Sequence, residues 1–172
     1  MAASAYHIAG GGTMPTIPYN RLAAVRYARK WALSRNPTYY NFDEIGGDCT
    51  NFASQCIFAG AGVMNFEPVY GWYYISPDER SPSWTGVDFL YNFLTTNKGR
   101  GPFGREVGQG LLQIGDIIQL GREDGRFYHS LVAVSTYPEI LIAAHTDDYL
   151  ERPLTSYTFD KIRYIHIDGV WL

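Results

Sequence analysis

Cys49 is the residue of this chain best placed to carry out chemistry. It lies in Gly46-Gly47-Asp48-Cys49-Thr50-Asn51, where a glycine loop runs into a segment with helical spacing. The unpaired N–H groups and the positive dipole end of a helix favour the thiolate over the thiol at such a junction. Two adjacent glycines also let a substrate carbonyl approach the backbone closely. Cys49 is therefore a candidate nucleophile.

A cysteine nucleophile needs a base, and a candidate lies far downstream. Residues 127–134 (FYHSLVAV) have the composition of a strand, with His129 near its beginning. A polar residue at the mouth of an otherwise apolar strand has little packing reason to be there. We therefore predict that His129 is the general base for Cys49. A surface histidine or a structural buried histidine is the alternative interpretation.

A third polar group would orient the imidazole of His129. If the hairpin after this strand turns at Thr136-Tyr137-Pro138, His145 falls opposite His129, whereas a turn shifted by one residue brings Thr146 there. His145 is our predicted third catalytic residue. The carboxylate alternatives follow it directly in the chain: Asp147 and Asp148.

The oxyanion formed during attack requires hydrogen-bond donors. The backbone N–H of Cys49 points outward from the predicted helix start and would be the first donor. Asn41 and Asn51 are near in sequence, although Asn51 can equally bond within the first helical turn. Asp48, next to the nucleophile, is a candidate substrate-binding residue.

Aromatic residues are abundant, at 16% of the chain with 14 Tyr and 4 Trp. This is more than a small core usually requires, so some of the rings are expected to line a binding cleft. Packing within the core is the alternative for each of them. The candidate cleft walls are Trp72, Tyr73, Tyr74 and Trp84.

A metal site is a rival use for the same side chains, because Cys, His and Asp are all metal ligands. No closely spaced pair such as His-x-x-x-His or Cys-x-x-Cys is present, so we predict no metal and no cofactor. The second cysteine, Cys56, would lie about 10 Å further along the same helix, too far for a disulfide with Cys49. It falls on an apolar stripe and is predicted to be a buried structural thiol.

The elements that must position these residues follow from hydrophobic spacing. Helical spacing covers 19 to about 34 with Asn20 as a cap, then 49 to 58 or 59, and 84–94, which would dock through Val87, Leu90 and Leu94. Strand patterns follow at 115–120, 125–135, 139–146 and 162–168. Helices first and strands after them predict an α+β fold, with N-terminal helices packed on an antiparallel sheet.

Length and charge limit the function classes. The 172 residues, 46% hydrophobic, fit one domain, which we place at 19–172 after a flexible tail or linker at 1–18. The net charge of −3 gives no reason to expect a nucleic acid or an anionic membrane as partner. No run reaches the roughly 18 apolar residues of a membrane span. The N-terminus lacks a signal-peptide pattern, and localisation stays open.

Four blocks of the chain resemble a known family. These are Gly46–Gln55 (GGDCTNFASQ), Tyr19–Ala28 (YNRLAAVRYA), Gly115–Ile118 (GDII) and His129–Val132 (HSLV). Together they resemble the bacterial putative amidase domain family, which is related to the papain-like cell-wall hydrolases of the NlpC and CHAP types. The resemblance spans about residues 19 to 167.

This resemblance implies a papain-like α+β fold, with the cysteine at a helix N-terminus packed against the sheet that carries the histidine. It implies a cysteine amidase or peptidase in which Cys49 is the nucleophile, His129 the base and His145 the third member. The implied substrate is a peptide of the bacterial cell wall (peptidoglycan), and the implied location is outside the cell or at its surface.

Three functions are therefore weighed. The first is an amidohydrolase that opens an amide bond through a thioester on Cys49. The second is a binding module of the same fold that holds a peptide or glycan without chemistry. The third is an acyltransferase or transpeptidase that passes the acyl group of the same thioester to an amine.

Overall fold

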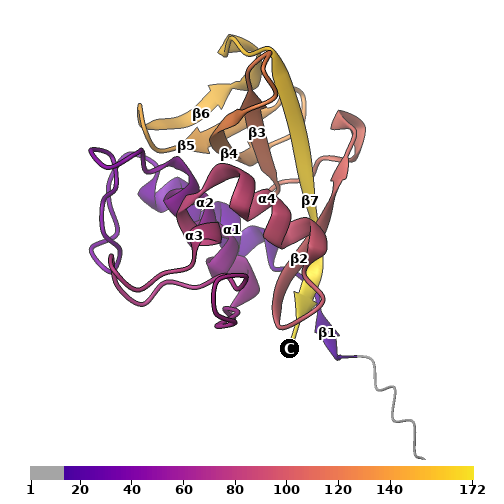
Figure 1. Cartoon of the computed structure of the whole chain (residues 1–172). Helices are drawn as coiled ribbons and strands as arrows, with labels where there is room; N and C mark the ends of the chain where they lie inside the picture. Colours follow the sequence, from indigo (N-terminus) through magenta and orange to yellow (C-terminus); the bar gives the residue numbers. More distant parts are fainter. Residues whose placement is uncertain (1–13) are drawn as a thin grey trace, which may run out of the picture.

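One antiparallel sheet organises the protein, and four helices lie against it (Figure 1). The computed structural model describes residues 14–172. Hydrogen-bonded neighbours follow the order β1-β7-β3-β4-β5-β6, and β2 also pairs with β7. The strands are β1 (Thr16–Ile17), β2 (Gly101–Val107), β3 (Ile117–Gly121), β4 (Phe127–Ser135), β5 (Leu141–Ala144), β6 (Tyr149–Pro153) and β7 (Lys161–Trp171). The predicted α+β class is confirmed.

The helices precede most of the sheet in the chain, as predicted. They are α1 (Arg21–Trp31), α2 (Cys49–Ala61), α3 (Pro82–Thr85) and α4 (Val87–Thr96), with short 3-10 turns at Gln109–Leu111 and Leu154–Ser156. Asn20 caps α1, since its side chain accepts a hydrogen bond of 3.0 Å from the N–H of Ala23. Helix α2 begins at Cys49, so the candidate nucleophile occupies a helix N-terminus.

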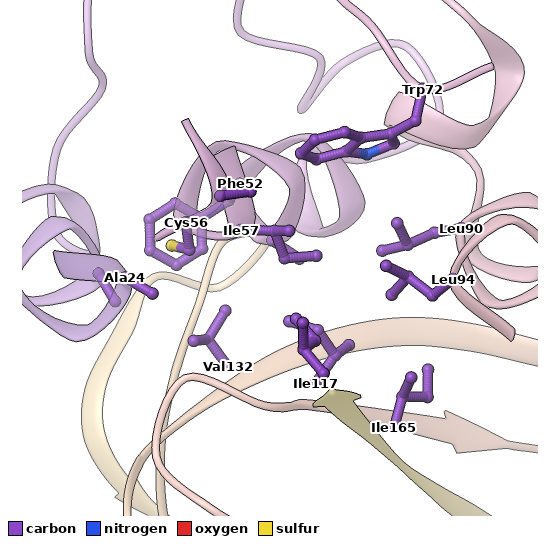
Figure 2. Close-up of a cluster of buried hydrophobic side chains, with 14 of the residues drawn as sticks. Ala24, Phe52, Cys56, Ile57, Trp72, Leu90, Leu94, Ile117, Val132 and Ile165 are labelled. Carbon is purple, nitrogen blue, oxygen red and sulfur yellow. The ribbon is translucent and has the colours of Figure 1, made fainter. Parts of the chain in front are cut away.

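The main core lies between the helices and one face of the sheet. Figure 2 shows side chains of α2, among them Phe52 and Ile57, facing Ile117 and Val132 of the sheet. Cys56 is fully buried in this cluster, as predicted. A second apolar cluster, which includes Leu120 and Leu131, covers the opposite face. The sheet is therefore covered on both faces.

Three details of the helical half differ from the sequence prediction. The helix expected over 84–94 is divided at Gly86, whose extended backbone (φ −105°, ψ 129°) separates α3 from α4. Leu90 and Leu94 are buried as predicted, but Phe93 takes the third docking position in place of Val87. Thr16–Ile17 pairs with Val170 and Trp171, so the folded part begins before residue 19. The rest of the expected tail, residues 1–13 with His7, lies outside the described residues.

Strands β4 and β5 pair in the second of the two registers that the sequence allowed. Val132 pairs with Ala143 and Ala133 with Ile142. This register is shifted by one residue from the one that would place His145 opposite His129. Side chains alternate between the two faces of a sheet. The shift therefore places the His145 side chain on the face that packs against the helices.

A buried acidic residue ties α1 to the far end of the sheet. Asp116 accepts hydrogen bonds from the Arg21 guanidinium at 2.6 Å, from His166 Nδ1 at 2.8 Å and from the Ile167 N–H at 3.0 Å. His166 therefore has a buried carboxylate as its partner, and Asp116 links α1 to β7. In residues 14–172, no helix has the length and apolar composition to cross a membrane.

Candidate active site

A tight loop positions Cys49 at the start of α2. The N–H groups of Ile45 and Gly47 both donate to the carbonyl of Phe42, at 2.8 and 3.1 Å. Gly46 and Gly47 have φ values of 89° and 100°, a region that side-chain-bearing residues rarely adopt. The two glycines are thus required by the turn that delivers the chain to the helix.

The buried Asp48 side chain stabilises this loop through hydrogen bonds. It is fully buried, and its carboxylate accepts hydrogen bonds from the Phe42 N–H at 2.9 Å and the Asn51 amide at 2.8 Å. Its backbone N–H donates to Thr146 Oγ1 at 3.0 Å. Asp48 was expected to contact substrate. Its carboxylate is instead occupied by protein donors, so it holds the loop in place.

His145 and Arg35 are the remaining partners of Asp48, and Arg35 Nε lies 3.4 Å from Asp48 Oδ2. His145 Nδ1 lies 2.6 Å from Asp48 Oδ2, and its Nε2 lies 2.8 Å from the Trp31 carbonyl. The ring also stacks on Phe52 at 4.0 Å between centroids. Both ring nitrogens are therefore engaged with protein oxygens. Neither nitrogen is left to orient His129, and the predicted contact between the two histidines does not form.

The Cys49 side chain lies at the edge of the core, 7% exposed. Its Sγ is 3.8 Å from Thr50 Oγ1, which in turn lies 3.0 Å from Ser130 Oγ on β4. Burial raises the pKa of the Cys49 thiol above its ordinary value, while hydrogen bonds from the Ser130 backbone and from Thr50 oppose that rise. The thiolate expected from the helix terminus is thus outweighed by desolvation.

His129 is half-buried near the beginning of β4, beside the rings of Tyr128 and Tyr157. Within residues 14–172 its ring forms no hydrogen bond, and none joins it to the Cys49 thiol. Burial lowers the pKa of His129 to about 4; the charge of Asp147 opposes this shift and that of Arg152 adds to it. The imidazole is therefore neutral at pH 7 and able to accept a proton.

Cys49 and His129 line the same pocket, of about 260 Å³. Three stretches of chain form its wall: the glycine loop with Cys49, the start of β4, and the segment from the end of β5 to Tyr157. The lining residues are Gly46, Gly47, Cys49, Tyr128, His129, Thr146, Asp147, Tyr149, Arg152 and Tyr157. The sequence indicated two members of this set, Cys49 and His129, as candidate nucleophile and base, and it offered Asp147 only as an alternative.

The predicted aromatic cleft walls lie elsewhere. Trp72 and Trp84 are fully buried, and their indole N–H groups donate to Ser54 and Asn51 at 3.0 and 2.9 Å. Tyr73 is half-buried against Phe66. Tyr74 is also buried and does not line the pocket. The tyrosines that do line it, Tyr128, Tyr149 and Tyr157, come from the strand half of the chain.

The side chains considered for the oxyanion site are occupied or distant. The Asn51 amide donates to the Tyr40 carbonyl and to Asp48, and its oxygen accepts from Trp84. Asn41 is exposed and does not line the pocket. The Asp48 side chain caps no amide of α2. The backbone N–H of Cys49 donates to no group within residues 14–172 and stays a candidate donor at this end of the pocket.

Two further findings concern the chemistry open to the site. In the part of the chain that the structure describes, no three His, Cys, Asp or Glu side chains are grouped so that they could hold a metal ion. Arg35, which follows α1, pairs with Asp43 at 2.6 Å and with Asp148 at 2.8 Å. Asp148, weighed as an orienter of His129, thus joins the two loops beside the pocket.

Comparison with known proteins agrees with one part of the resemblance found in the sequence, the putative amidase domain. A family model described as "Putative amidase domain" matches residues 18–167. A relative from Bacillus subtilis (strain 168), "Uncharacterized protein YhbB", is 37% identical over 119 residues, which is 68% of this chain and 37% of the relative. The chain thus matches little more than a third of that protein's length. No solved structure matches. Since the family model covers most of the chain, this protein belongs to the Putative amidase domain family.

Proposed function

We propose that this protein is a cysteine-dependent amide hydrolase. One observation carries the proposal: Cys49 and His129, 80 residues apart in the chain, line a single pocket. The family match supports an amidase. The helix-terminal cysteine beside a histidine-bearing antiparallel sheet supports the papain-like arrangement and the relationship to the NlpC and CHAP types.

The reaction that we propose begins with neutral partners. His129 removes the proton of the Cys49 thiol as Sγ attacks the carbonyl carbon of the amide. The same imidazole then protonates the leaving amine as the C–N bond breaks, which leaves a thioester on Cys49. Water, deprotonated by His129, opens the thioester, releases the acid and returns the thiol. The Cys49 N–H would donate to the oxyanion.

Asp147 is the better candidate for the third catalytic residue. It lines the pocket together with His129, and its charge favours the protonated form of that ring. His145 is engaged by Asp48 and Trp31 instead. Hydrogen bonds between catalytic groups often shorten only when substrate binds, so the missing contact between Cys49 and His129 is compatible with catalysis.

The resemblance to cell-wall hydrolases favours a peptide of bacterial peptidoglycan as the substrate. The test is release of a free amine from peptidoglycan-derived peptides by the parent protein and three variants. We expect Cys49→Ala and His129→Ala to lose at least about a hundredfold in rate. Cys56→Ala, which removes the buried thiol, should keep the rate per folded molecule. Full activity in Cys49→Ala would exclude this mechanism.

A second candidate is a binding module without chemistry, and the raised pKa of Cys49 favours it. The rate of Cys49 alkylation by iodoacetamide against pH separates the two. A rate that falls markedly in His129→Ala supports the hydrolase. An ordinary thiol profile, unchanged by that substitution, supports the binding module.

A further inference from the structure

Arg152 is the single cation among the residues that line the pocket. Its guanidinium lies over the rings of Tyr149 and Tyr157, at 4.1 and 3.9 Å from their centroids. The two rings stand almost perpendicular to each other, at 82°. Cation–π contacts on two rings hold the guanidinium plane in a fixed orientation. Arg152 is thus a positioned group rather than a mobile surface charge.

The guanidinium keeps unused donors. Nε donates to Ser156 Oγ at 2.8 Å and Nη2 to the Ser156 carbonyl at 3.3 Å. Of its five N–H groups, the two on Nη1 and one on Nη2 have no partner within residues 14–172. These remaining N–H groups form the end-on edge that can donate to both oxygens of one carboxylate.

Arg152 also lacks a counter-ion, in contrast to Arg35 and Arg163; Arg80, a half-buried arginine over Phe42 outside this pocket, is the other shielded arginine without one among residues 14–172. Arg35 pairs with Asp43 and Asp148, and Arg163 pairs with Asp88 at 2.7 Å. Within residues 14–172, no carboxylate oxygen lies within 4.0 Å of the Arg152 nitrogens. A half-buried cation that is oriented but unpaired, in a pocket beside a nucleophile, is suited to an anionic ligand.

We propose that Arg152 binds a carboxylate of the substrate, next to the amide bond that Cys49 opens. This inference rests on the proposed function and names its substrate class: peptides with an acidic side chain or a free terminal carboxylate beside the scissile bond. A pocket of about 260 Å³ holds a group of about one residue. Asp147, on the same wall, disfavours a second carboxylate.

Binding of this kind would also act on the base. The charge of Arg152 lowers the pKa of His129. A substrate carboxylate would offset that charge, and His129 would become a stronger base when an acidic substrate is bound. Substrate selection and proton transfer would then be coupled through one residue.

The test uses alkylation of Cys49, which does not depend on amide hydrolysis. Bromoacetyl-glycine carries a carboxylate, and bromoacetyl-glycinamide is its neutral counterpart; each forms a bond from Sγ to the methylene carbon as bromide leaves. Mass spectrometry separates Cys49 from Cys56. In the parent, after correction for the intrinsic reactivity of each reagent toward free cysteine, we expect the carboxylate reagent to react about tenfold faster. Bromoacetyl-aspartic acid α-amide shows whether a side-chain carboxylate is preferred to a terminal one, and a preference for either supports the proposal.

Variants test whether the preference for the carboxylate reagent depends on Arg152. Arg152→Gln should reduce the ratio of the two rates to about one, because it removes the charge and the forked donor. Arg152→Lys should keep a smaller preference. Arg126→Gln is the matched control, since it removes a positive charge from an exposed pair with Asp124 outside the pocket. Equal rates for the two reagents in the parent, or a preference unchanged in Arg152→Gln, would overturn the proposal.

A measurement on the parent alone covers the case in which Arg152→Gln does not fold. Acetyl-glycine should protect Cys49 from iodoacetamide in a saturable way, and acetyl-glycinamide should not. Equal protection by both compounds would also refute carboxylate binding. The failure of the proposed function looks different: hydrolysis would survive in Cys49→Ala, whatever the charge preference of alkylation.

Discussion

At the residue scale, the surroundings of the two candidate histidines separate their roles. His145 is enclosed by Asp48, the Trp31 carbonyl and the ring of Phe52. His129 has no hydrogen-bond partner in residues 14–172 and faces the pocket. A histidine with both nitrogens engaged serves structure, whereas a neutral and unengaged one can take up a proton.

His145→Gln is expected to reduce stability. The substitution removes the closest hydrogen-bond partner of the buried Asp48 carboxylate, and a buried group left without its partner costs about 1–3 kcal/mol. Urea denaturation should show a lower midpoint with an unchanged slope. His129→Gln, the comparison variant, should unfold close to the parent at pH 7. A stable His145→Gln protein without hydrolase activity would restore His145 as a catalytic residue.

The low pKa of His129 predicts a pH dependence of stability. In the folded protein this pKa is about 4 instead of the ordinary 6.5. Between these values the unfolded chain binds a proton at this residue that the folded protein does not, so the free energy of unfolding falls as pH decreases from 6.5 towards 4. Urea midpoints over this range should fall more steeply for the parent than for His129→Gln. Parallel curves would show that the imidazole is not desolvated.

At the scale of elements, helix α2 sets the position of Cys49, and the packing of this helix depends on one glycine. A Cβ added at Gly60 would lie 2.3 Å from Tyr19 Cε2 and 2.9 Å from the Asn20 carbonyl oxygen. The Tyr19 ring is itself held by a hydrogen bond of 3.0 Å from its hydroxyl to the Gly115 carbonyl. The C-terminal turn of α2 therefore lies directly against the chain entering α1.

Gly60→Ala should destabilise the protein by about 1–3 kcal/mol, because the clash outweighs the better helix propensity of alanine. Gly108→Ala is the control. Its φ is −73° and an added Cβ meets nothing within 4 Å, so this variant should match the parent. Differential scanning calorimetry of the two variants measures the contrast. Equal transition temperatures would show that Tyr19 moves aside freely.

The sequence predicted the elements whose signal is local. Helix α1 has a capping asparagine and regular apolar spacing, and α2 begins where the glycine loop indicates. Strand β2 escaped prediction because GPFGREV contains two glycines and a proline, and it is a strand by virtue of its pairing with β7. The short β6 depends in the same way on β5.

The sequence predicted those members of the candidate site that residue type and local context indicate. Cys49 and His129 stand out by their sequence context, and both line the pocket. Whether His145 or Thr146 lies opposite His129 depends on a shift of one residue in the hairpin register, which the sequence does not determine. Arg152 carries no sequence signal, since its importance comes from two tyrosine rings brought beside it by the end of the sheet.

At the scale of the whole molecule, Asp116 joins the beginning of α1 to strands from the second half of the chain. Asp116→Asn should lower stability by about 3 kcal/mol, because Arg21 and His166 lose a buried carboxylate partner. Tryptophan fluorescence and far-UV circular dichroism should report the same shifted urea midpoint, as in a single cooperative unit. Separate midpoints would indicate that the helices and the sheet unfold independently.

The pocket draws on residues 46–49 and on residues 128–157, and nothing between them lines it. Contacts between such distant segments form only after the intervening chain has lost much of its freedom. A nascent polypeptide that has not yet reached residue 128 therefore has Cys49 but neither His129 nor Arg152. The pocket can form only once residues 128–157 have been made, so a chain interrupted before them contains the thiol but not the pocket around it.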